Sequence, residues 1–151
     1  MHAFWKPARV VPVVLAVLLG ACRDHGGDPD LSARLATFVA KGEGTVVDMR
    51  VVAPFAWERV WIFGPRTQQL EIERKMRFLW PDAAKTGIAS RDDASLVVFT
   101  VGSKVARYML HPLTQGDFSK VDRNGLVPPE AVFRVHLADG RPLLLSAAAA
   151  P

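Results

Sequence analysis

The sequence predicts a single small α+β domain, with a mainly antiparallel sheet of about six strands and two short helices. Two pairs of β-prone runs are each joined by a short glycine-containing turn, which is typical of β-hairpins. Two other segments repeat apolar residues at helical spacing. The chain has 151 residues, half of them hydrophobic, which suits one domain and excludes a wholly disordered chain. We place this domain at residues 31–146 and expect a disordered tail at 147–151.

The first predicted helix covers residues 31–41, with Asp30 as its N-cap and Gly42 directly after its end. Its apolar residues recur at i, i+4, i+7 and i+8 and therefore share one face: Leu31, Leu35, Phe38 and Val39. The polar segment 22–30 before it contains glycine and proline, so we expect a flexible tether there.

The second predicted helix covers residues 67–77, with Thr67 as its N-cap and Pro81 beyond its end. Its apolar face consists of Ile72, Met76, Leu79 and Trp80. Two i, i+4 charge pairs in the favourable order support it: Glu71 with Lys75, and Glu73 with Arg77.

Strands are predicted from runs rich in β-branched and aromatic residues, namely 45–53, 57–63, 96–101, 104–110, 131–138 and 142–146. Gly102-Ser103 joins the third and fourth runs, and Asp139-Gly140 joins the fifth and sixth, so these four strands form two hairpins. We expect residues 82–93 to form a loop and residues 112–129 to form a long surface excursion.

The first 21 residues have the features of a secretory signal peptide. Lys6 and Arg9 make a basic start, and an apolar run and small residues follow up to Cys22. The apolar run is shorter than the roughly 20 residues that a membrane-spanning helix needs.

Leu19-Gly20-Ala21-Cys22 resembles the lipobox of bacterial lipoproteins. The resemblance implies that the Cys22 sulfur receives a diacylglyceryl group and that the chain is cut before Cys22. Several acyl chains would then hold the protein at the membrane. Arg23 stands where an Asp favours inner-membrane retention in enterobacterial lipoproteins, so we expect the outer membrane, facing the periplasm. The alternatives are an ordinary signal peptide or an uncut membrane anchor.

Charge and cysteine content exclude several classes of function. Removing Lys6 and Arg9 with the signal peptide lowers the formal net charge from +4 to +2. The chain has no run of five like charges, which argues against binding to nucleic acid. The single cysteine excludes an intramolecular disulfide and a cysteine-rich metal site. We expect neither a metal nor a cofactor.

The sequence carries no contiguous catalytic motif of the nucleophile-elbow, zinc-protease, P-loop or dinucleotide-binding type. Asp122 to Gly125 resembles the middle of a calcium loop but lacks its other ligands, so we interpret it as a turn. Scattered residues could still form a site, with segment 112–129 as its wall. The candidates are His111, His136, Ser103, Ser119, Ser146, Glu58, Asp92, Asp93, Asp117 and Glu130.

Alternation along residues 57–63 places Trp57, Arg59 and Trp61 on one strand face. These residues either belong to the core or form an aromatic surface that binds a partner, because Trp and Arg are frequent at interface hot spots. The pattern W-x-x-V-x-I-F-G-P at 57–65 resembles small secreted proteins and lipoproteins of bacteria to which no activity is assigned. That resemblance implies a compact envelope domain.

Together these observations predict a membrane-anchored lipoprotein of the cell envelope. We expect a non-enzymatic binding module that is attached to the membrane through lipid on Cys22 and binds an envelope protein or another envelope component. A small envelope hydrolase and a carrier of a hydrophobic ligand are the alternatives.

Overall fold

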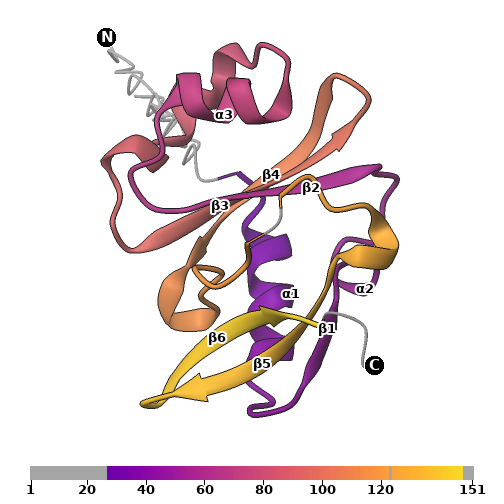
Figure 1. The fold of residues 1–151 in the computed structure, drawn as a ribbon, viewed down its shortest axis with the longest axis vertical. Helices are drawn as coiled ribbons and strands as arrows, with labels where there is room; N and C mark the ends of the chain where they lie inside the picture. Colours follow the sequence, from indigo (N-terminus) through magenta and orange to yellow (C-terminus); the bar gives the residue numbers. More distant parts are fainter. Residues whose placement is uncertain (1–26, 123, 148–151) are drawn as a thin grey trace, which may run out of the picture.

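The computed structural model describes residues 27–122 and 124–147, and the statements below concern this part of the chain. The signal peptide, the lipobox with Cys22 and residues 148–151 lie outside it. The predicted α+β class with six antiparallel strands is confirmed, but the strands form two three-stranded sheets instead of one. Figure 1 shows one sheet above the other, with α1 running alongside both.

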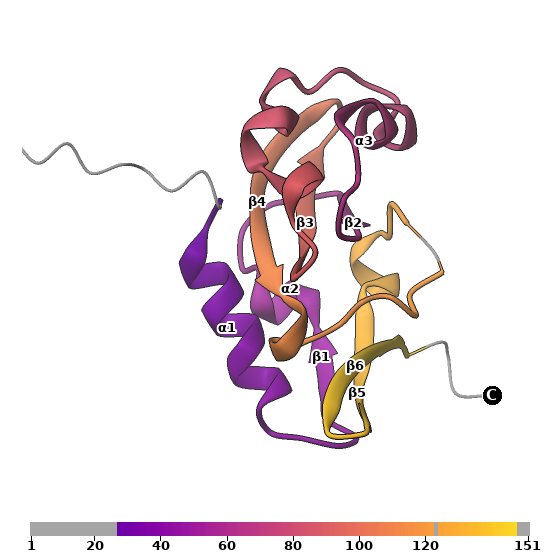
Figure 2. The same cartoon turned by 90° about the vertical axis from the view of Figure 1, so that its left-hand side faces the viewer.

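The first sheet has the strand order β2 (Arg59–Phe63), β3 (Ala94–Val101) and β4 (Lys104–Pro112). The predicted β3–β4 hairpin is confirmed and extends two residues further at each outer end. Every residue of β3 except Val101 is buried, because the strand is central and both of its faces are covered. Helix α3 (Gln69–Met76) packs on one face, and α1 with the rest of the core packs on the other (Figure 2).

The second sheet has the strand order β1 (Val46–Asp48), β5 (Val132–Ala138) and β6 (Arg141–Ser146). The β5–β6 hairpin is confirmed. The expected strand at 45–53 is wrong in its second half, which forms the one-turn helix α2 (Met49–Val52). Asp48 ends the strand because its Oδ1 accepts a hydrogen bond from the Arg50 amide at 2.9 Å and so caps this turn.

Helix α1 (Pro29–Val39) begins two residues earlier than predicted, and its N-cap is Asp28 instead of Asp30. Asp28 Oδ1 accepts the amides of Asp30 and Leu31, both at 3.1 Å, and Pro29 occupies the first helical position. Residues 27–30 are therefore part of the fold and not of the tether. Gly27 has φ +78°, and a Cβ there would lie 2.3 Å from the Tyr108 carbonyl oxygen, so only glycine fits.

Helix α3 is shorter than predicted at both ends. The Thr67 hydroxyl donates to the Gly64 carbonyl at 2.7 Å instead of capping the helix, and Arg77 in the left-handed conformation ends it. The pair Glu71–Lys75 forms at 3.3 Å, whereas Glu73 accepts the Trp80 amide and does not pair with Arg77. The expected loop at 82–93 contains two 3-10 helices, η1 (Pro81–Thr86) and η2 (Ile88–Ser90).

Segment 112–129 is not the surface excursion that its composition suggests. Besides η3 (Leu113–Gln115) and the start of η4 (Pro128–Glu130), it contributes the buried side chains of Phe118 and Leu126. Leu126 exchanges two backbone hydrogen bonds with Val60 of β2, at 2.9 and 3.0 Å. Asp117 likewise exchanges backbone bonds with β6, at 2.9 and 2.8 Å. This segment therefore connects the two sheets.

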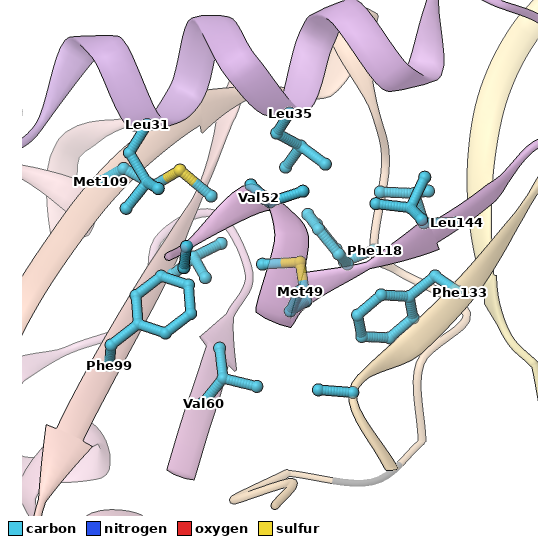
Figure 3. Packing of buried hydrophobic residues seen from close by; sticks show 14 of the residues in the cluster. Leu31, Leu35, Met49, Val52, Val60, Phe99, Met109, Phe118, Phe133 and Leu144 are labelled. Atoms are coloured by element: carbon cyan, nitrogen blue, oxygen red, sulfur yellow. The ribbon is translucent and has the colours of Figure 1, made fainter. Parts of the chain in front are cut away.

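The larger core lies where α1, α2 and the two sheets meet. Figure 3 shows Leu31 and Leu35 pointing from α1 towards Met109 and Val52, with Phe118 and Phe133 farther along the same cluster. A smaller cluster lies between α3, η1 and the other face of the first sheet, and it includes Ile72 and Met76. Leu79, predicted for this apolar face, is 80% exposed.

Candidate functional site: a cleft beside the start of helix α1

Of the three residues that the sequence suggested for partner binding, the structure places Trp57 apart from Arg59 and Trp61. Trp57 precedes β2 and belongs to the larger core, where its ring meets Phe99 edge-on at 5.4 Å between centroids. Its indole N–H donates to the Ala53 carbonyl at 3.1 Å. The core interpretation therefore holds for Trp57, which is only 8% exposed and cannot form part of an aromatic contact surface.

Arg59 and Trp61 do lie together, and both hold the turn at Gly125 against β2. The Arg59 guanidinium donates to the Gly125 carbonyl at 2.7 Å. The Trp61 ring covers Gly125 so closely that a Cβ there would lie 2.8 Å from it, and its indole N–H donates to Thr100 Oγ1 at 3.0 Å. Both side chains therefore have a structural role within the domain. Partner binding by the exposed Arg59 stays a prediction.

A cleft with a volume of about 770 Å³ lies beside the first turns of α1. Residues of helix α1, the 3-10 segment 81–90, the start of β3 and the end of β4 line it. The residues that line it are Gly27, Pro29, Ser32, Ala33, Lys85, Thr86, Gly87, Arg91, Ala94, Leu110, Pro112 and Gln115. None of them was selected individually from the sequence, although Pro112 and Gln115 belong to segment 112–129, which we expected to form the wall of a site.

The cleft combines an apolar lining with two cations. Each cation is held by an exposed acid: Lys85 Nζ lies 2.7 Å from Asp82, and Arg91 Nε lies 2.8 Å from Asp93. The hydrogen bond that Lys85 donates to Asp82 raises the pKa of Lys85, and the one that Arg91 donates to Asp93 raises the pKa of Arg91, so both stay charged at neutral pH. Exposed pairs of this kind contribute little to stability and can exchange partners.

A buried hydroxyl–imidazole pair lies behind the cleft. Ser32, in the second turn of α1, has its Oγ 2.8 Å from Nδ1 of His111, which is fully buried near the end of β4. The Gln115 carbonyl lies 3.0 Å from Nε2. Because a carbonyl only accepts, Nε2 carries the proton and Nδ1 accepts from the Ser32 hydroxyl. Both ring nitrogens are thus satisfied inside the protein, and the pair ties α1 to β4 and η3.

Burial of His111 predicts that the domain loses stability in mild acid. Desolvation lowers the pKa of His111 below its ordinary value of 6.5, so the folded state resists a proton that the unfolded state binds. The free energy of unfolding should be unaffected above about pH 6.5 and fall below it, by up to about 1.4 kcal/mol per pH unit for one group. The measurement is urea denaturation between about pH 5 and pH 7.5.

One variant identifies the group responsible for this slope. Replacing His111 by Gln should flatten the dependence of unfolding free energy on pH. A slope that persists in the His111 variant would rule out this origin. The carboxyl groups of Glu43, Asp48 and Asp93 have lowered pKa values and lose their partners only in stronger acid.

Several of the other scattered candidates make hydrogen bonds or ion pairs with nearby parts of the domain. Asp92 pairs with Arg66 at 3.2 Å, and Glu58 accepts the Gly102 amide at 2.8 Å. Asp117 accepts the Ser119 amide at 2.8 Å. Asn124 docks the turn on β2, accepting the Ile62 amide and donating to its carbonyl, both at 2.7 Å.

Comparison of the chain with known protein families, with curated proteins and with solved structures finds no match. Within residues 27–122 and 124–147, no cluster of three His, Asp or Glu side chains could hold a metal ion. No helix in that same part is long and apolar enough to cross a membrane. The functional argument therefore rests on the cleft and on the sequence before it.

Proposed function

We propose that this protein is a lipid-anchored lipoprotein of the cell envelope whose domain binds a small amphiphile with an anionic group. The cleft beside α1 is the observation that carries the binding role. The lipobox supports the anchor. Arg23 follows Cys22 in place of the Asp that favours retention in the inner membrane, which supports the outer membrane. The domain acts as a binding module in this proposal, not as an enzyme.

The lining of the cleft supports an amphiphilic ligand. Pro29 and Ala33 of α1, Ala94 of β3, and Leu110 and Pro112 of β4 offer apolar contact. Burying such surface together with an apolar ligand chain removes both from water. A volume of about 770 Å³ lies within the range of small-molecule sites.

The two cations support the anionic group. A carboxylate or phosphate on the ligand can replace Asp82 on Lys85 or the bidentate Asp93 on Arg91, because both acids are solvent-exposed. A guanidinium also matches the two oxygens of such a group in geometry. The ligand chain then lies along the apolar lining while its charged end stays at the rim.

Filling the cleft should abolish ligand retention. Ala33 is exposed and lines the cleft, so Ala33→Trp adds a bulky ring there without entering the core. Native mass spectrometry of full-length protein extracted from its own envelope should show an added small-molecule mass. The fraction of protein that carries this ligand should be at least tenfold lower in the variant than in the wild type.

Thr37→Trp is the matched control, because Thr37 is exposed one turn further along the same helix and lines no described cleft. It should retain the ligand as the wild type does. Equal occupancy in both variants would contradict binding in this cleft. Wild-type protein that carries no ligand at all would contradict the binding role itself.

A further inference from the structure

Leu79 is the most exposed of the large hydrophobic side chains of the described residues, at 80%. It lies in the short connection between α3 and η1, which is held in a fixed shape. Arg77 takes the left-handed conformation before it, and the amide of Trp80 after it donates to Glu73 Oε1 at 2.9 Å. Phe78 and Trp80 on either side pack on the smaller core, so this connection presents one leucine to solvent from a rigid base.

Residues 74–85, on either side of Leu79 in the sequence, contain four cations, Arg74, Lys75, Arg77 and Lys85, and one acid, Asp82. Lys75 is paired with Glu71 at 3.3 Å and Lys85 with Asp82 at 2.7 Å, which leaves Arg74 and Arg77 as the excess positive charge. All four cationic residues are exposed. A solvent-exposed leucine surrounded by Lys and Arg is the composition of segments that lie in the interface of an anionic membrane.

This segment also lies close to the point where the described chain begins. Trp80, Asp82 and Lys85 line a second cleft, of about 640 Å³, together with Gly27 and Asp28. Cys22 precedes Gly27 by five residues, which span at most about 18 Å even when fully extended. If Cys22 is acylated, as proposed above, the 27–28 edge of this cleft stays within that distance of the lipid.

We propose that residues 74–85 form a membrane-contact surface, with Leu79 inserted among anionic phospholipid headgroups and Arg74 and Arg77 bound to their phosphates. This inference rests on the proposed lipid anchor at Cys22. It assigns the domain a fixed orientation, with α3 and η1 towards the membrane and the β5–β6 turn away from it. Figure 1 shows α3 and that turn at opposite ends of the molecule.

The test places a fluorophore at Leu79 in the full, acylated protein. The chain has one cysteine, and acylation blocks its thiol, so Leu79→Cys supplies the one free thiol for labelling with a nitrobenzoxadiazole probe. Leu137→Cys is the matched control, since this leucine of β5 is also exposed, at 43%, but lies near the far turn.

The labelled proteins are placed in vesicles of phosphatidylcholine with phosphatidylglycerol that contain a lipid with a nitroxide in its headgroup region. We expect at least threefold stronger quenching at position 79 than at 137, and weaker quenching at 79 when phosphatidylglycerol is omitted. Equal quenching at both positions in acylated protein would overturn the contact surface and leave the anchor intact. A preparation that carries no acyl group on Cys22 would overturn the anchor and this inference together.

Discussion

Replacing Cys22 by serine is expected to abolish the incorporation of labelled fatty acid into this protein. In the proposed lipobox the acceptor of the diacylglyceryl group is a thiol, and the serine hydroxyl is a much weaker nucleophile at neutral pH. Without the diacylglyceryl group, the peptide bond before residue 22 should not be cut, so the apolar residues 10–19 should remain on the protein. Metabolic labelling, followed by measurement of the mass of the product, reports both steps.

The neighbouring substitution Arg23→Gln is the control, because it changes the next residue and keeps Leu19 to Cys22 intact. It should incorporate as much label as the wild type. Equal label in the Cys22→Ser variant would refute the lipobox assignment and favour an ordinary signal peptide. A full-length precursor that is labelled but never cut would instead favour an uncut anchor.

Local chemistry was sufficient to predict the two hairpins. The turns Gly102-Ser103 and Asp139-Gly140 join apolar runs of matching length, and a two-residue turn fixes the pairing of the strands beside it. Helix α1 was predicted for the same reason, from one apolar face of regular spacing. Its N-cap was misplaced by two residues, although Pro29, a residue that suits the first helical position, indicates Asp28 over Asp30.

Tertiary contacts decide the features that the sequence did not show. Asp48 stops a β-prone run because its carboxylate caps a helical turn, which leaves Met49 and Val52 buried under α1. Propensity favours a strand over the same residues. The burial of Phe118 and Leu126 could not be predicted from the polar segment 112–129, because single apolar residues in a polar stretch show no periodicity.

The cleft could not be predicted for a further reason. Its lining comes from three separate stretches of the chain, 27–33, 85–94 and 110–115, which meet only in the folded domain. Ser32 and His111 are 79 positions apart and form their hydrogen bond only because α1 packs on β4. A serine on the buried side of a predicted helix was a usable signal, because a buried hydroxyl requires a partner. Nothing in the sequence indicates which of the histidines provides it.

Truncating Phe118 to alanine should produce the largest loss of stability of any change in the connecting segment. Its side chain is 3% exposed and meets Phe133 edge-on at 5.4 Å between ring centroids, and His111 at 6.3 Å. Replacing a buried Phe by Ala costs about 3–5 kcal/mol, because apolar burial is lost and a cavity remains. The free energy of unfolding of such a domain is only about 5–15 kcal/mol. The variant should therefore unfold at a much lower urea concentration.

Lys120→Ala is the matched control, since Lys120 is exposed two residues further along the same segment. It should change the unfolding free energy by no more than about 0.5 kcal/mol. A loss below about 1 kcal/mol for Phe118→Ala, outside the usual cost of such a cavity, would contradict the connecting role of this segment. Because Phe118 contacts both His111 behind the cleft and Phe133 in the second sheet, its removal should also weaken ligand retention in the cleft. The position of the segment between the two sheets thus links the stability of the domain to the shape of the proposed binding cleft.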